Sequence, residues 1–185
     1  MKVFQNYHRH AMYTNVRISD SAVTPKDYAE RAKALRHGIL SSAEHGWQGN
    51  YFETVRLAKE YGLKPLIGAE AYWVKDRTEK DRTNCHIFLG AKNERGRQAL
   101  NDVLSEANLT GFYGQPRLDV PLLLSLPKDD LIVTTACIAY WRYENIEEIT
   151  AMLAKHFGKN FFLEVQYHNT ESQRELNKRI LRLHN

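Results

Sequence analysis

Residues 62–74 have the sequence Gly-Leu-Lys-Pro-Leu-Ile-Gly-Ala-Glu-Ala-Tyr-Trp-Val. Gly62 stands where the end of a helix over residues 50–61 is expected, and Pro65 to Val74 predicts a long, mostly apolar strand. Glu70 is unusual in so apolar a run, because an unpaired buried carboxylate is costly. This stretch therefore predicts a helix followed by a strand that carries one acidic side chain into the fold.

The same alternation of helix and strand continues in both directions along the chain. Thr24 is a good N-cap and Pro25 a good first residue for a helix. Strands are predicted at residues 2–7, 38–43, 65–74, 85–91, 131–136 and 161–167, and further helices at 50–61, 94–108, 119–126, 146–157 and 172–183, with a loop at 110–117. Because every strand but one precedes a helix, the pattern predicts an α/β fold with a parallel sheet and favours closure into a barrel.

Length and composition indicate a single globular domain over residues 1–185. The chain is 43% hydrophobic, and 26 Lys and Arg against 22 Asp and Glu give a net charge of +4. This length excludes a complete replicative polymerase, and the mild positive charge is compatible with a nucleic-acid partner without requiring one. We expect a cytoplasmic protein with no membrane partner, because the chain lacks a bilayer-spanning run and a signal peptide, and its two cysteines make no disulfide framework.

Possible metal ligands lie at or near the ends of the predicted strands. His8 and His10 follow the first strand, and residues two apart on an extended chain share a face, so these two imidazoles can hold one metal ion. The other positions of this kind are His45 in Glu44-His45-Gly46, Glu70, His86, Cys137, the alternating Glu164, Gln166 and His168, and Asp20 in the loop after the first strand. In a parallel barrel the C-terminal ends of the strands form the rim that carries the active site.

Each of these features also has an ordinary explanation. A lone His-x-His is usually a surface pair, and Glu70 can pair with Lys64 or Arg77. His86 can be a satisfied core histidine, and Cys137 a small buried hydrophobe. Their coincidence at one rim is what predicts a centre for several metal ions.

The order of these motifs resembles the PHP (polymerase and histidinol phosphatase) domain. More closely, it resembles the N-terminal PHP domain of DNA polymerase III alpha subunits of bacteria or their phages. The matching segments are His8-Arg9-His10 with Tyr13-Thr14, Glu44-His45-Gly46, Gly62 to Tyr72, His86 to Gly96, Ser105 to Ala107, Gly111 to Tyr113, Pro116 to Asp119, Leu131 to Cys137 and Phe162 to His168. The segments at Pro116 to Asp119 and at Ala136-Cys137 favour the polymerase branch over the phosphatase branch.

The resemblance implies a distorted (βα)7 barrel with up to three divalent metals, which are zinc, manganese or iron. The implied ligands are His8, His10, Asp20, His45, Glu70, His86 and Cys137, and we expect His8, His10, His45 and Glu70 to be catalytic. In this scheme Glu70 bridges two ions, His8 and His10 hold the first, and His45 and Cys137 hold another.

The family resemblance implies two functions, and a third remains open. One is a metal-dependent phosphoesterase, specifically a 3′–5′ exonuclease acting on DNA. The second is a scaffold that stabilises the other polymerase domains and docks a proofreading exonuclease subunit. The third is a free-standing phosphatase of the histidinol phosphatase kind, which the polymerase-like segments disfavour.

Two departures from the family pattern affect these expectations. Glu44 replaces the usual aspartate, so we expect altered support of His45. The family's final Asp-x-His motif, on a seventh strand, is absent before Asn185. The sequence analysis therefore predicts a fragment of a longer polymerase chain that stops before that strand.

Overall fold

A computed structural model describes residues 4–184 of the chain. The helices are α1 (Pro25–Ala34), α2 (Tyr51–Tyr61), α3 (Glu94–Thr110), α4 (Val120–Ser125), α5 (Ile146–Phe157) and α6 (Glu171–His184). The strands are β1 (Ile39–Ser42), β2 (Lys64–Trp73), β3 (Cys85–Ala91), β4 (Phe112–Tyr113), β5 (Gln115–Leu118), β6 (Leu131–Thr134) and β7 (Phe161–Phe162). Short 3-10 turns are η1 (Met12–Val16), η2 (Ile138–Arg142) and η3 (Gly158–Asn160).

The strands form one mixed sheet in the order β4-β5-β2-β3-β6-β7, with β1 paired to β2. The pairs β1–β2, β2–β5 and β6–β7 are parallel, whereas β3 runs antiparallel to both β2 and β6. The α/β class predicted from the sequence is confirmed, but the prediction of a purely parallel sheet is wrong at β3. Residues 74–84 link β2 to β3 without a helix, and parallel neighbours need a longer crossover connection.

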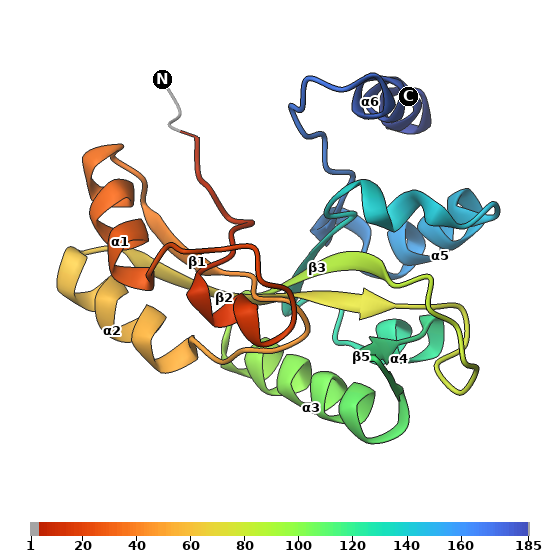
Figure 1. The fold of residues 1–185 in the computed structure, drawn as a ribbon, viewed down its shortest axis with the longest axis horizontal. Coiled ribbons are helices and arrows are strands. Elements are labelled where there is room, and N and C mark those ends of the chain that lie inside the picture. The colour runs from red at the N-terminus through yellow and green to blue at the C-terminus, as the bar shows by residue number, and fades with distance from the viewer. Residues whose placement is uncertain (1–3, 185) are drawn as a thin grey trace.

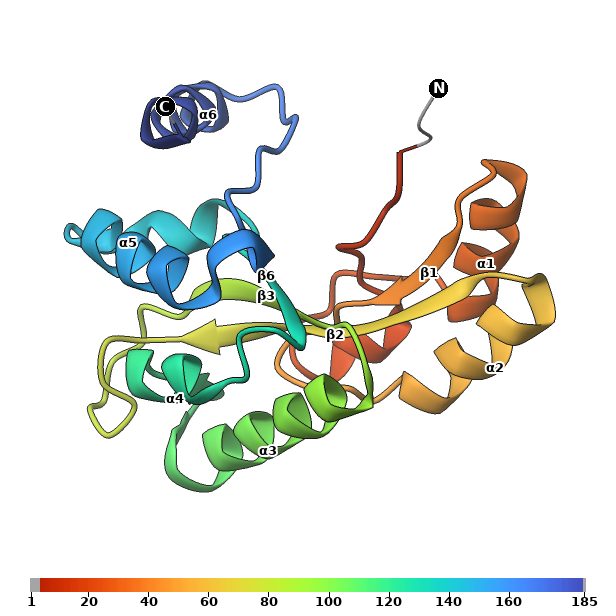
Figure 2. The ribbon, with the colours of Figure 1, turned by 180° about the vertical axis from the view of Figure 1, so that it is seen from behind.

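Helices cover different parts of this sheet. Figures 1 and 2 show α1 and α2 against the β1 end and α3 along β2 and β3. The buried side chains of α3 and α5 both pack on the face of β2 and β3 that carries Ala71 and Ile87, which is opposite to the face that carries Glu70. A large apolar core joins β2, β3 and β6 to α3 and α5, and a smaller one joins β1 to α1 and α2. The helix α6 lies beyond α5 in both views. No helix within residues 4–184 is long and apolar enough to cross a bilayer.

Several predicted element boundaries match local chemistry. Thr24 accepts a hydrogen bond from Asp27 N and the Asp27 carboxylate accepts one from Thr24 N, so α1 begins with a capping box before Pro25. Gly62 ends α2 in the left-handed conformation, with φ of 67°. The N-cap and C-cap predictions at these positions are therefore confirmed.

Three predicted segments differ. Residues 4–7 form no strand, and residues 2–3 of that predicted strand lie outside the described residues. The predicted loop 110–117 contains the hairpin of β4 and β5. The strand predicted at 161–167 ends at Phe162, which pairs with Thr134, the last residue of β6.

Candidate metal centre

Glu70 on β2 is the centre of a cluster of imidazole side chains. Its side chain is only 2% exposed, although it is acidic. Four imidazole nitrogens contact its two carboxylate oxygens: His8 Nε2 at 3.2 Å and His86 Nδ1 at 3.3 Å from Oε1, and His10 Nε2 at 3.3 Å and His45 Nδ1 at 2.9 Å from Oε2. The buried acid predicted from the apolar run is thus surrounded by histidines rather than by Lys64 or Arg77.

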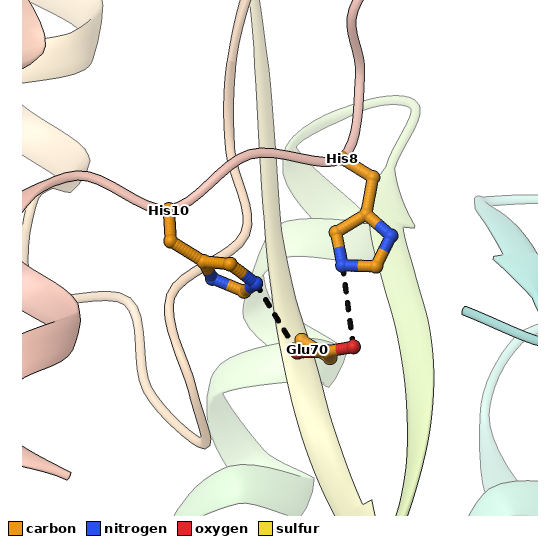
Figure 3. Close-up of side chains that lie close together, drawn as sticks. All are labelled: His8, His10 and Glu70. Atoms are coloured by element: carbon orange, nitrogen blue, oxygen red, sulfur yellow. Dashed lines mark ion pairs between the residues drawn. The ribbon is translucent and has the colours of Figure 1, made fainter. Parts of the chain in front are cut away.

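The N-terminal segment brings His8 and His10 to this carboxylate. Figure 3 shows both imidazoles reaching from this segment to opposite oxygens of Glu70. The segment is held by Glu44, whose carboxylate oxygens accept hydrogen bonds from Ala11 N at 3.1 and 3.2 Å and from Asn50 Nδ2 at 2.6 Å. Glu44 therefore positions the backbone next to His10, whereas the sequence had predicted a role in supporting His45.

His45 reaches Glu70 because the chain after β1 continues alongside β2. His45 and Glu70 form an isolated parallel bridge, in which Glu70 N donates to Glu44 O and Gly46 N donates to Glu70 O. On its other ring nitrogen, His45 Nε2 lies 3.2 Å from Asp20 Oδ2. Asp20, in the loop after the first predicted strand, therefore contacts the cluster through His45.

His86 and Cys137 complete the wall opposite the N-terminal segment. In the antiparallel β2–β3 register His86 pairs with Tyr72 and Phe88 pairs with Glu70, so His86 is a diagonal neighbour of Glu70 on one face. Cys137 follows β6, and its Sγ lies 3.4 Å from His86 Nδ1. All seven residues that the sequence analysis proposed as ligands line a single recess of 390 Å³, together with Ile18 and Gln166.

The donor set fits divalent metal ions. Two groups, His8-His10-Glu70 and His45-Glu70-His86, each have donor atoms within 4.8 Å of one another. His45 Nδ1 is 2.9 Å from a Glu70 oxygen, yet it has no hydrogen-bond partner among residues 4–184. The two atoms are therefore close together, but the angle between them does not suit a hydrogen bond. That arrangement suits two ligands of one cation, and Glu70 belongs to both groups. The ligand that joins His45 and Glu70 in the second group is His86, whereas the sequence had predicted Cys137 as the partner of His45.

Charge and burial set the protonation of the cluster. Burial opposes ionisation of Glu70, but its contacts with His10, His45, His8 and His86 outweigh burial and hold its pKa well below the usual range. Burial also opposes the cationic form of His8, yet Glu164 and Glu70 together raise the pKa of His8 to about 10. Burial and the nearby Glu70 charge raise the pKa of the Cys137 thiol to about 12. A cation bound here therefore displaces protons from His8 and Cys137.

Glu164 is a site residue whose role the sequence did not identify. Its carboxylate accepts hydrogen bonds from Tyr7 Oη at 2.7 Å and Thr134 Oγ1 at 2.8 Å, and lies 3.1 Å from His8 Nδ1. A carboxylate on Nδ1 accepts the proton of that nitrogen and orients the ring so that Nε2 of His8 faces Glu70, where it would be the nitrogen that binds a cation. The spacing of Glu164 and Gln166 placed them on one face, and Gln166 Nε2 does donate to Glu164 at 2.7 Å. The sequence offered no signal that Glu164 would contact His8.

Comparisons with known proteins agree with these features. Residues 6–168 match the family model described as the PHP domain. DNA polymerase III subunit alpha of Borreliella burgdorferi is 31% identical over 97% of this chain, and that of Aquifex aeolicus is 28% identical over 98%. The chain spans only 16% and 17% of the lengths of these two relatives. A structure described as a candidate metal-dependent phosphoesterase from Bifidobacterium adolescentis has a TM-score of 0.41 and 16% identity, covering 85% of this chain and 57% of that chain.

Proposed function

The chain belongs to the PHP domain family, and we propose that it is a metal-dependent phosphoesterase domain that removes nucleotides from the 3′ end of DNA. Family membership confirms the resemblance and the PHP-type α/β fold predicted from the sequence. The observation that supports the activity is the sharing of one buried carboxylate, Glu70, by two groups of imidazole ligands. Clusters of this kind are used for hydrolysis of phosphate esters.

The proposed ligands are the seven ionisable residues that line the recess. His8, His10 and Glu70 would hold one divalent ion, and His45, Glu70 and His86 a second, with Asp20 and Cys137 at the margins. When bound, such ions polarise a phosphoryl oxygen and lower the pKa of a bound water. The metal is one of zinc, manganese or iron, which all accept imidazole and carboxylate ligands.

The protein groups have distinct roles in this proposal. Glu70 supplies the shared negative charge, since its low pKa keeps it ionised at neutral pH. Glu164 holds His8 in one tautomer, and Glu44 holds the backbone beside His10. The recess is open enough to admit a phosphate group, so the proposed catalytic residues His8, His10, His45 and Glu70 can contact it.

The choice of DNA as substrate follows from the relatives. They are named as subunits of DNA polymerase III, and this chain matches a small part of each. We therefore propose the remaining polymerase domains, DNA and a proofreading subunit as partners, in the cytoplasm of a bacterium. A domain that trims 3′ ends would act next to the site where a polymerase extends them.

The test combines metal content with cleavage. Purified wild-type protein is analysed for bound transition metal and then incubated with labelled single-stranded DNA and Mn²⁺. Glu70→Gln is expected to lose both bound metal and 3′-end cleavage, while Glu60→Gln, at an exposed position of α2 that pairs with Arg56, retains both. Wild-type protein without metal, or equal cleavage by the Glu70 variant, would overturn the proposal.

The same experiment separates the scaffold function. The sharing of Glu70 by four histidines ties the N-terminal segment to β2 and β3, which is also what a structural centre requires. If chelation lowers the unfolding temperature and no DNA or phosphomonoester is cleaved under any metal, the centre is structural. Cleavage of a simple phosphomonoester without cleavage of DNA would favour a phosphatase.

A further inference from the structure

Arg9 is a buried cation without an acceptor for its hydrogen bonds. It stands between the two histidines of the first motif in the sequence, and the residue is 5% exposed. Its Nε, Nη1 and Nη2 atoms are all buried and have no hydrogen-bond partner among residues 4–184. No carboxylate among residues 4–184 lies within 4.0 Å of the Arg9 guanidinium.

The surroundings of Arg9 do not neutralise it. The guanidinium stacks on the ring of Tyr28, at 4.3 Å from the ring centroid, and its in-plane N–H groups are unpaired and shielded from solvent. The charge of Glu44 acts on Arg9, but both Glu44 oxygens already accept hydrogen bonds from Ala11 N or Asn50 Nδ2. A guanidinium stays cationic at neutral pH even when it is buried, so Arg9 keeps its positive charge.

Arg9 lines a second recess that adjoins the metal centre. This recess has a volume of 380 Å³ and is also lined by His8, His10, Asp20, Ser21 and Tyr28. His8, His10 and Asp20 line the metal-centre recess as well, so these three side chains form the wall between the two. A buried, unpaired guanidinium is costly unless an anion accepts its hydrogen bonds.

We propose that this second recess, the Arg9 recess, binds a phosphate group of the substrate next to the phosphate held at the Glu70 centre. The identity of this second phosphate as part of a nucleotide chain rests on the proposed function. Arginine suits this role, because its planar fork, once turned from Tyr28 toward the recess, can donate two parallel hydrogen bonds to phosphate oxygens. The volume exceeds that of a single phosphate, so an attached sugar can enter. A substrate with two adjacent phosphates would then be preferred over a nucleoside monophosphate.

The first test uses metal-free protein, so that it does not depend on the Glu70 centre. The full chain is treated with a chelator and titrated with inorganic phosphate and with thymidine 3′,5′-bisphosphate. We expect Arg9→Gln to weaken binding of both probes by about tenfold or more, since it removes a charge-assisted hydrogen-bond donor. Arg56→Gln on the exposed face of α2 is the control and should bind within about twofold of wild type.

A second measurement does not require a substitution that could disturb folding. The Arg9 Nε–H is buried, so its NMR resonance is expected to exchange slowly and to be visible in wild-type protein. Addition of phosphate should shift this resonance, and Arg9→Lys should retain part of the phosphate affinity. An unshifted Nε–H resonance, or wild-type affinity in Arg9→Gln, would overturn the proposal and leave an ordered water as the partner of Arg9.

The two proposals fail in different ways. If the protein holds no metal but Arg9-dependent phosphate binding is measured, the phosphoesterase function is lost and the phosphate site stands. If metal-dependent DNA cleavage is measured and Arg9→Gln binds thymidine 3′,5′-bisphosphate as wild type does, the phosphate site is lost and the phosphoesterase stands. With both intact, Arg9→Gln should raise the KM for a dinucleotide that carries two phosphates by a larger factor than the KM for a simple phosphomonoester.

Discussion

At the scale of single residues, Glu70 shows what a sequence can reveal about a site. An acid inside an apolar strand is expensive to bury, and this cost alone indicated that it has specific partners. The partners themselves could be proposed because His8, His10, His45 and His86 each stand near a strand end. Glu164 also stands near a predicted strand end, but its contact with His8 could not be predicted, since that contact depends on where the chain runs after β7 ends at Phe162.

The first prediction concerns Glu164. Replacing it by Gln keeps the size of the side chain but removes the charge that faces His8 Nδ1 and that accepts from Tyr7 and Thr134. We expect metal affinity to fall by about 10–100-fold, as for other partners of metal-bound histidines. Competition with a chromophoric chelator measures this change.

The control for Glu164 is Glu171→Gln, at an exposed position on α6. Its metal affinity should equal that of wild type. A Glu164→Gln variant that folds and binds metal with unchanged affinity would show that the carboxylate does not orient His8.

At the scale of secondary-structure elements, local signals predicted the helices better than the sheet. Caps such as Thr24 and Gly62 act through neighbouring residues, so the sequence contains them. The direction of β3 depends on the helix-free linker 74–84, and β7 ends where its pairing partner β6 ends, at Thr134. Pairing between distant strands is set by tertiary packing, which strand patterns alone do not encode.

The second prediction concerns Asp81 in the linker before β3. Asp81 accepts hydrogen bonds from Thr83 N at 2.7 Å, Thr83 Oγ1 at 2.6 Å and Tyr143 Oη. Burial opposes its ionisation, but these bonds outweigh burial and lower its pKa below the ordinary value. Asp81→Asn should therefore lower the free energy of unfolding at neutral pH by about 1–2 kcal/mol.

The pH dependence of this effect has a definite sign. A depressed folded-state pKa stabilises the fold above the unfolded-state pKa of about 3.9, and this contribution is lost as the pH falls through the folded-state value. The gap between wild type and Asp81→Asn should thus narrow below about pH 4. Urea unfolding at several pH values measures it, with the exposed Asp102→Asn of α3 as control. A gap that widens in acid would contradict the assignment.

The third prediction concerns Gly96 in the first turn of α3. A helix interior favours Ala over Gly by about 1 kcal/mol. A Cβ at Gly96, however, would lie 2.2 Å from the backbone oxygen of Asp130, which cannot move away cheaply. Because the clash involves backbone, we expect Gly96→Ala to destabilise the protein by about 1–3 kcal/mol.

Gln98→Ala on the exposed side of the same helix should change stability by less than about 0.5 kcal/mol. A more stable Gly96→Ala protein, measured by urea unfolding, would mean that helix propensity wins.

At the scale of the whole molecule, the candidate centre joins segments that are far apart in the sequence. His8 and His10 come from the N-terminal segment, Glu70 from β2 and His86 from β3. Residues 4–7 of the N-terminal segment form no strand, so the contacts with Glu70 and Glu164 are a large part of what holds it. A cation bound by these residues would cross-link parts of the chain that the sheet does not pair.

The last prediction follows from this cross-linking. A ligand that binds only the folded state at about 100 times its Kd stabilises it by about 2.7 kcal/mol, which is about 5–10 °C in Tm for a chain of this size. Adding Mn²⁺ or Zn²⁺ to chelator-treated protein should therefore raise Tm by about this amount. The reason is that the ligands come from four separate parts of the chain, which lie close together only in the folded state, so the metal binds the folded state alone. Glu70→Gln should abolish the increase, since Glu70 belongs to both ligand groups, whereas Glu60→Gln should retain it. Differential scanning calorimetry with and without metal gives the comparison. If metal analysis finds ions bound and Tm is nevertheless unchanged by chelation, the ions lie elsewhere and the cluster around Glu70 is held together by its own ion pairs.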